Sequence, residues 1–296
     1  MFKDRVVIHN DVYDAIVDAS LTRLTNDHLF HCLQKLSFHG KSPMSLTEID
    51  SGMLYLVNSK NFGAPSELAL YNINIHPKQL IRFSHFDSIT TLEISAMQAI
   101  KLPSENSLCF CNLRRVTLSL VLFEGDCQRR FFKALGQAKL EYVDIGGMEY
   151  APSMRKLQKI LNALCDHCDH DTLRILIMRI SPDDEGDFDW VDEIQSIEVG
   201  DLEPLACFSQ LQALRISEAT EVHEDDVKPI ASFLARSFPD LEECGIVPLR
   251  THTPHSETNY EDLNSIPGKD WQAVWKELER IKGRTTFTGD VCSHLL

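Results

Sequence analysis

The chemically most suggestive stretch of the chain is Cys165-Asp166-His167-Cys168-Asp169-His170, which offers two thiols and two imidazoles. Four such side chains are ligands that a tetrahedral zinc ion accepts. Zinc sites, however, usually join two separated ligand pairs, and the chain has no second Cys-x-x-Cys. The alternative is a polar helix end with Cys165 buried. We therefore predict no metal and no cofactor, and a zinc or thiol enzyme at Cys165 and Cys168 is the remote alternative.

Other short motifs do not point to catalysis. Gly40-Lys41-Ser42 resembles the end of a phosphate-binding loop, but Lys35 stands where its first glycine should be. The acidic run Asp183–Asp187 lacks the alternating acids of a calcium loop. The chain contains neither Gly-x-Ser-x-Gly nor His-Glu-x-x-His. Catalytic residues can converge from distant positions, so the expectation that the protein is not an enzyme, with no catalytic residue, rests on these motifs alone.

The composition and charge of the chain limit the kinds of partner and the location that the sequence predicts. The 296 residues carry a formal net charge of −15, which argues against nucleic-acid binding and favours a protein partner with a basic surface. No stretch approaches the roughly 20 apolar residues of a membrane span, so we expect no membrane partner. The N-terminal residues include four aspartates and no unbroken apolar run, so we expect no secretory signal and a cytoplasmic or nuclear location. The nine cysteines are then expected to be mostly reduced, buried side chains, among them Cys32, Cys111, Cys207 and Cys244.

A short pattern recurs along the chain: an apolar residue, two others, an apolar residue, one other, and an apolar residue. Its first positions are 24 to 38 residues apart, and leucine-rich repeats have about 20–29 residues, so several units fit and others need insertions. Proline takes the first position once. The eight units begin at Leu33, Pro65, Ile89, Leu113, Leu140, Leu173, Leu211 and Leu241.

This pattern has a geometric meaning. The second and third apolar residues lie two positions apart, so both point to one face of a short strand. One such unit cannot bury that face alone, and neighbouring units must stack as parallel strands with helical crossovers. The prediction is an α/β leucine-rich-repeat solenoid, a horseshoe with parallel strands on the concave face and helices on the convex face; a doubly wound α/β sheet is the alternative. Apolar spacing predicts helices over Lys78–Phe86, Gln128–Ala138, Met154–Cys165, Asp226–Phe238 and Asp270–Ile281.

Three regions follow from these patterns. Residues 1–30 are expected to form a helical cap containing Val12, Ile16 and Val17, residues 31–250 the repeat domain, and residues 251–296 a linker and C-terminal helical cap or tail. Asp183–Glu193 and Pro248–Gly268 are expected to be loops. Two tryptophans of the last helix either dock onto the final repeat or bind a partner.

Phe238-Pro239-Asp240-Leu241-Glu242-Glu243 resembles the strand entry of leucine-rich-repeat F-box proteins. Phe208–Leu214 and Phe86–Leu92 are similar to the same family's F-x-x-L-x-x-L units, and the uneven repeats over residues 31–250 resemble those of fungal F-box-like proteins. The resemblance implies target recognition within a Skp–cullin–F-box ubiquitin ligase, with a Skp-type adaptor as partner if an F-box is restored. An F-box usually opens with Leu-Pro, which residues 1–30 lack; the F-box itself is not found. The alternative is a stand-alone scaffold or inhibitor with no ubiquitin role.

The fold prediction also defines a binding surface. Residues that alternate with the core positions must face outward on the inner curve, where Arg and Tyr are typical binding hot spots. Alternatively, these charges are solvated or pair with one another across neighbouring strands. The predicted partner-binding residues are Tyr71, Glu93, Arg115, Tyr142, Asp144, Ile175, Ile177, Arg179 and Arg215.

Overall fold

In the computed structural model the described residues belong to two compact units, Met1–Leu140 and Glu141–Leu296. No described helix is both long enough and apolar enough to cross a membrane. The structure describes residues 5–9, 35–39, 66–71, 77–95, 108–119, 127–145, 154–179, 195–217, 220–247, 269–283 and 286–287.

The described part of the first unit contains five parallel strands that neighbour one another in chain order. Their register has no slip: Lys35 pairs with Glu67, Glu67 with Thr91, and Thr91 with Arg115. Side chains at equivalent positions therefore form rows across the sheet. The strands are β1 (Arg5–His9), β2 (Lys35–His39), β3 (Glu67–Tyr71), β4 (Thr91–Ser95) and β5 (Arg115–Ser119).

The second unit repeats the arrangement. Its strands run parallel in the order β6-β7-β9-β11-β12, and a separate two-stranded parallel pair, β8 with β10, lies outside this sheet. The main strands are β6 (Tyr142–Ile145), β7 (Ile175–Met178), β9 (Ala213–Ser217), β11 (Glu243–Val247) and β12 (Thr286–Phe287). The separate pair is β8 (Gln195–Ser196) and β10 (Thr220–Glu221).

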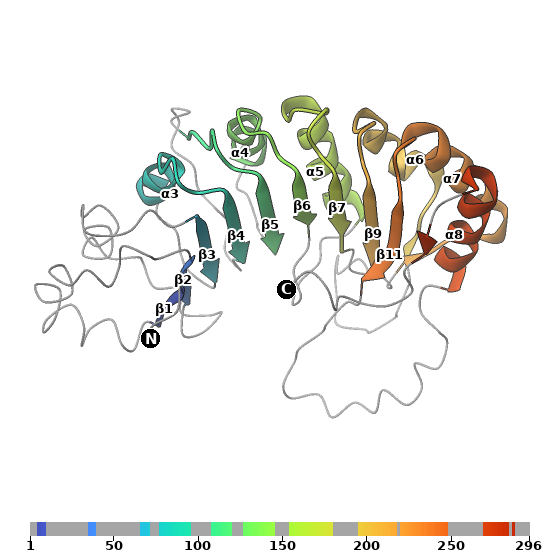
Figure 1. Ribbon diagram of the computed structural model, residues 1–296, viewed down its shortest axis with the longest axis horizontal. Coiled ribbons are helices and arrows are strands. Elements are labelled where there is room, and N and C mark those ends of the chain that lie inside the picture. The colour runs from blue at the N-terminus through green and yellow to red at the C-terminus, as the bar shows by residue number, and fades with distance from the viewer. Residues whose placement is uncertain are drawn as a thin grey trace, which may run out of the picture. The chain divides into compact units, whose positions relative to one another are not determined.

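Helices cover the core side of the strands within each unit (Figure 1). The five helices predicted from apolar spacing are all confirmed, with ends shifted by a few residues. α6 and the short 3₁₀ helix η2 were not predicted. The helices are α3 (Pro77–Ser84), α4 (Cys127–Leu135), α5 (Met154–His167), α6 (Val199–Leu202), η2 (Glu203–Cys207), α7 (Glu224–Ser237) and α8 (Lys269–Lys282).

Where the structure describes their burial, the predicted core positions are buried, except Ile246, which is half-buried. Leu92 and Leu176 are fully buried at the second position of the pattern, and Ile94 and Ile216 at the third. Burial of a leucine or isoleucine side chain stabilises the fold by about 1.5–3 kcal/mol. Because parallel strands in register put these residues in continuous rows, the core runs unbroken from repeat to repeat within a unit. The predicted α/β leucine-rich-repeat solenoid is thus the observed fold.

A tight turn precedes the strands and explains the Phe-x-x-Leu units. The backbone N–H of Leu241 donates to the carbonyl of Phe238 at 3.2 Å, and that of Leu211 to the carbonyl of Phe208 at 3.1 Å. The next two N–H groups, Glu242 and Glu243, then share the carbonyl of Gln212 in the preceding repeat, at 2.9 and 3.0 Å. Phe208 and Phe238 are themselves buried, so the aromatic ring anchors the turn that starts each of these strands.

The C-terminal helix docks on the last repeat, as one of the two alternatives for its tryptophans predicted. Trp271 and Trp275 are 0% and 1% exposed, and α8 packs against α7. The indole Nε1 of Trp271 donates to Thr220 Oγ1 at 2.8 Å. Gly283, at φ 71°, ends the helix in the left-handed region that glycine adopts without strain.

Some expectations for the chain ends differ from what is observed or lie outside the described residues. Residues 5–9 form a strand that adds one repeat before the first predicted one, and the sequence pattern did not indicate it. The expected helix around Val12, Ile16 and Val17 and the expected loops Asp183–Glu193 and Pro248–Gly268 lie outside the described residues. The boundaries at residues 30 and 250 stay predictions.

Candidate functional site

The cysteine- and histidine-rich stretch forms the end of α5 and the turn after it. The N–H of Cys168 donates to the Leu164 carbonyl at 2.8 Å, which closes the last turn, and the Cys168 side chain is buried. His170 Nε2 lies 2.5 Å from the Cys165 carbonyl oxygen, and its ring packs edge-on against Phe208. Within the part of the chain that the structure describes, no group of three or more His, Cys, Asp or Glu side chains is placed to hold a metal ion.

Three cysteines are more exposed than the sequence predicted. Cys165 is half-buried because it lies at the edge between α5 and η2, and Cys111 is exposed because it lies in the turn before β5. Cys207 is also only half-buried. Cys168 and Cys244 are buried, and burial raises the pKa of each thiol to about 12 because the thiolate would lose its hydration.

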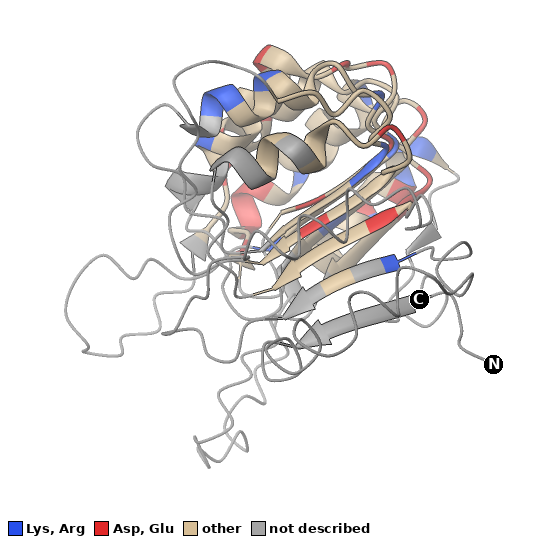
Figure 2. Cartoon of the chain, turned by 90° about the vertical axis from the view of Figure 1, so that its left-hand side faces the viewer, with Lys and Arg blue, Asp and Glu red and all other residues tan. Residues whose placement is uncertain are grey.

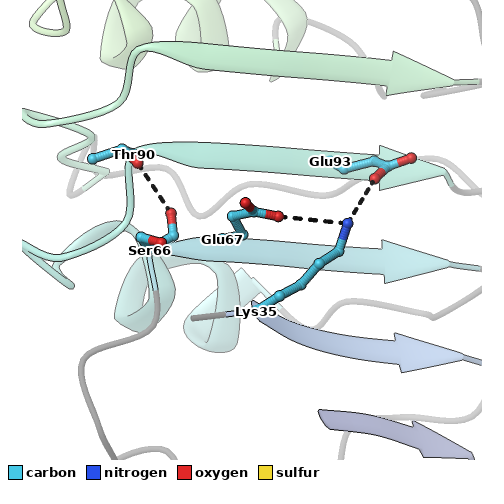
Figure 3. A network of polar contacts seen from close by, with 5 residues as sticks. All are labelled: Lys35, Ser66, Glu67, Thr90 and Glu93. Carbon is cyan, nitrogen blue, oxygen red and sulfur yellow. Dashed lines mark hydrogen bonds and ion pairs between the residues drawn. The ribbon is translucent and has the colours of Figure 1, made fainter. Parts of the chain in front are cut away.

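The outward face of the first unit carries a small charged network on β2, β3 and β4. Lys35 Nζ lies 3.6 Å from Glu67 Oε2 and 4.0 Å from Glu93 Oε2 (Figure 3). Parallel strands lie about 4.8 Å apart, so one flexible lysine reaches carboxylates on two neighbouring strands. The glutamates are 42% and 31% exposed, and such solvated pairs contribute about 0–1 kcal/mol each to stability.

The predicted residues of this unit lie on the same outward face. Glu93 is half-buried within the network, Tyr71 is half-buried at the end of β3, and Arg115 is exposed at the start of β5. Arg115 aligns with Thr91 and, through it, with Glu67. Both signs of charge therefore lie on this face, and Figure 2 shows both on the described strands.

The outward face of the second unit brings the six other predicted residues together: five lie on β6, β7 and β9, and Arg179 directly follows β7. Tyr142 pairs in register with Ile175, and Asp144 with Ile177. Ile177 in turn pairs with Arg215. Tyr142 and Ile175 are half-buried, whereas Ile177 is only 4% exposed. An aromatic and an aliphatic side chain thus lie side by side and partly open to solvent.

Charged residues beside this apolar pair are ion-paired. Arg179 Nη1 forms an ion pair with Asp144 Oδ1, and the two side chains are 14% and 7% exposed. Tyr142 Oη donates to the other carboxylate oxygen of Asp144 at 3.4 Å. Arg215 pairs with Glu243 on the next strand, with Nε donating to Oε1 at 3.1 Å. The alternative that Arg179 and Arg215 pair across strands is therefore what the structure shows for these two residues.

Sequence patterning placed these residues on one face but did not identify their partners. Glu243 and Lys35 were not among the nine predicted residues, although the strand pattern puts both on this face. Which side chains pair depends on strand neighbours 28 to 35 residues away in sequence. Only the strand order could supply that information.

Together, the register and the turn geometry define the class of protein: each unit is a stretch of α/β leucine-rich-repeat solenoid. No protein-family model matches the chain, and no curated protein matches it. Among solved structures it is similar to internalin C2 of Listeria monocytogenes, with a TM-score of 0.37 and 17% identity over 79% of this chain and 85% of that one. It is also similar to internalin F of the same bacterium, with a TM-score of 0.36 and 12% identity over 80% of this chain and 62% of that one.

Proposed function

We propose that the protein is a protein–protein interaction module that holds a polypeptide against the outward strand faces of its repeats. The observation that carries the proposal is the outward face of β6, β7 and β9. There Tyr142 and Ile175 lie side by side and half-exposed, next to the ion pairs Asp144–Arg179 and Arg215–Glu243. We propose that this face and the face with Tyr71, Glu93 and Arg115 both contact the target.

The chemistry of these faces suits a polypeptide. Aromatic and aliphatic side chains supply the apolar area that dominates protein interfaces, and arginine adds directed hydrogen bonds. Because Arg179 and Arg215 are already held by carboxylates, a partner meets charges whose geometry is fixed, and less conformational entropy is lost on binding. Both signs of charge occur on the faces, and the net charge of −15 opposes a nucleic-acid backbone.

The first unit suggests which surface the partner offers. Glu67 and Glu93 are the more exposed members of their network, at 42% and 31%, whereas Lys35 is 27% exposed and lies between them. A lysine or arginine of a partner can reach the same carboxylates. We therefore propose a target with a basic surface, in keeping with the acidic charge of the chain.

Within this role, we propose target recognition in an F-box-like ubiquitin-ligase context, in the cytoplasm or the nucleus. Its support is the sequence resemblance of the units at Phe86, Phe208 and Phe238 to leucine-rich-repeat F-box proteins. Purification of the full chain from eukaryotic cells tests it, because a Skp-type adaptor is then expected in the eluate. A chain that binds targets without any adaptor supports the stand-alone scaffold or inhibitor instead.

The interaction proposal itself is tested by matched surface variants of the full chain. Ile175→Lys places a charge in the half-exposed apolar pair, and Ser232→Lys places the same charge on the exposed side of α7. Arg115→Glu and Lys133→Glu form the corresponding pair in the first unit, because Lys133 is exposed on α4. Arg179 is left intact, because its loss would leave the buried carboxylate of Asp144 without its ion-pair partner.

Quantitative affinity purification compares these variants with the unchanged chain. A target recovered with the unchanged chain and with both controls should fall by at least about tenfold for Ile175→Lys, since hot-spot changes cost more than 1.4 kcal/mol. A smaller loss is expected for Arg115→Glu. Equal recovery of every protein by Ile175→Lys, Arg115→Glu and their controls would refute the proposed surfaces.

A further inference from the structure

Two cysteines of the second unit, one on α5 and one on η2, lie in direct contact. Cys165 is in the last turns of α5 and Cys207 ends η2, 42 residues further along the chain. Their sulfur atoms are 2.6 Å apart. The carbonyl oxygen of Pro204 lies 2.5 Å from Cys165 Sγ and 3.2 Å from Cys207 Sγ. Both residues are half-buried.

The surrounding packing holds the two segments together independently of the sulfur contact. Leu164 of α5 and Leu205 of η2 are both fully buried. Gln158 Nε2 donates to Asp201 Oδ1 at 2.6 Å and so ties α5 to α6, directly before η2. The pair therefore does not depend on one flexible side chain, and the sulfurs, 2.6 Å apart, have only a short distance to close to the roughly 2.05 Å of a disulfide.

The two thiols are chemically unequal. The hydrogen bond between the two sulfurs raises the pKa of Cys165 and lowers that of Cys207, so deprotonation of the pair falls first on Cys207. Burial and the nearby Asp166 oppose the thiolate at both positions. Cys168, one helical turn from Cys165, is buried with a pKa of about 12, so it competes poorly for an oxidant.

We propose that Cys165 and Cys207 form an oxidisable dithiol, which a peroxide converts into a disulfide that cross-links α5 to η2. The Cys207 thiolate attacks hydrogen peroxide, a sulfur–oxygen bond forms, the O–O bond breaks, and the hydroxide that leaves takes up a proton to give water. The Cys165 sulfur then attacks the Cys207 sulfenic acid, and the hydroxyl group leaves as a second water with the Cys165 proton. Two thiols thus lose two electrons and two protons, and the peroxide is reduced to two waters.

The chain contains a second close cysteine pair that serves as an internal comparison. Cys109 and Cys111 have their sulfurs 2.7 Å apart but are separated by a single residue in one turn. A bond between them would join no two elements of the fold. Of these two described pairs, only Cys165–Cys207 would close a long loop, one that includes β7, and long loops are where a cross-link restricts the unfolded chain most.

The experiment uses the full chain, reduced and then titrated with hydrogen peroxide at neutral pH. Non-reducing tryptic digestion with tandem mass spectrometry should find the peptide of Cys165 joined to that of Cys207, with fragmentation between Cys165 and Cys168 to assign the sulfur. The melting temperature should rise by about 5–15 °C on oxidation and fall back on reduction. Cys165→Ser and Cys207→Ser should each abolish both effects, whereas the double variant Cys109→Ser/Cys111→Ser should keep both.

A second measurement decides the case if the Cys165 and Cys207 variants fold poorly. Alkylation of the unchanged reduced chain with iodoacetamide, followed residue by residue over pH, should label Cys207 at lower pH than Cys165. Oxidation that yields only unlinked sulfinic or sulfonic acids, or a disulfide that leaves the melting temperature unchanged, would overturn the proposal. It is independent of the proposed binding role, because neither readout involves a partner.

Discussion

The hydrogen bond between Trp271 and Thr220 offers a sharp test of how the C-terminal helix is anchored. The two side chains are 0% and 1% exposed, and Trp271 Nε1 donates to Thr220 Oγ1 at 2.8 Å. Thr220→Val keeps the shape of the side chain but removes the acceptor. The indole N–H is then buried without a partner, which costs about 1–3 kcal/mol. We expect α8 to lose that much stability against local opening.

A double-mutant cycle, with Trp275 as a control, separates the free-energy contribution of the Trp271–Thr220 hydrogen bond from that of the packing of the ring. In Trp271→Phe the donor disappears together with part of the ring, so the double variant with Thr220→Val should be more stable than the sum of the single effects by about 1 kcal/mol. Trp275 is the matched control. It is 1% exposed and its ring centroid is 5.2 Å from that of Trp271, but among the described residues its Nε1 has no hydrogen-bond partner.

Native-state hydrogen exchange of the α8 amides measures these free energies locally, which matters because repeat units can open separately. Trp275→Phe removes ring volume but no hydrogen bond, so it should cost about 1 kcal/mol less than Trp271→Phe. Equal losses in the two tryptophan variants, together with unchanged exchange in Thr220→Val, would refute the hydrogen bond as an anchor of the helix.

Two further predictions concern the core. Leu92→Ala and Leu176→Ala, each at a fully buried strand position, should lower the free energy of unfolding by about 2–5 kcal/mol in urea denaturation; a loss below 1 kcal/mol would contradict a close-packed core at those rows. Cys168 and Cys244 have thiol pKa values raised from an ordinary 9.0 to about 12. Their contribution to stability is therefore complete below pH 9 and is lost as the pH rises towards 12, so Cys168→Ala and Cys244→Ala should flatten the decline in stability over this range. Labelling of either cysteine by a thiol reagent at pH 8 as fast in the native as in the unfolded chain would contradict the burial.

Much of the fold could be predicted because its signals are local. The two apolar residues of each unit lie two apart, so one short strand must turn both to the same face, and Leu92 with Ile94 or Leu214 with Ile216 are buried as that rule requires. Helices such as α8 were predictable because Trp271 and Trp275 repeat at helical spacing. β1 was missed because Lys3 stands two residues before the strand, at the position where the other units have leucine, isoleucine or proline.

The candidate binding surfaces also combine features that the sequence determines with features that depend on the tertiary structure. Sequence alternation alone determined which residues face outward, Tyr142, Ile175 and Arg115 among them, because the direction of a side chain on a strand is fixed by its neighbours in the chain. Only the tertiary structure decided that Arg179 is held by Asp144 and that Cys165 contacts Cys207. These contacts join atoms that lie 35 and 42 residues apart in sequence. Their distances are set by strand order and helix packing, and no local spacing rule contains that information.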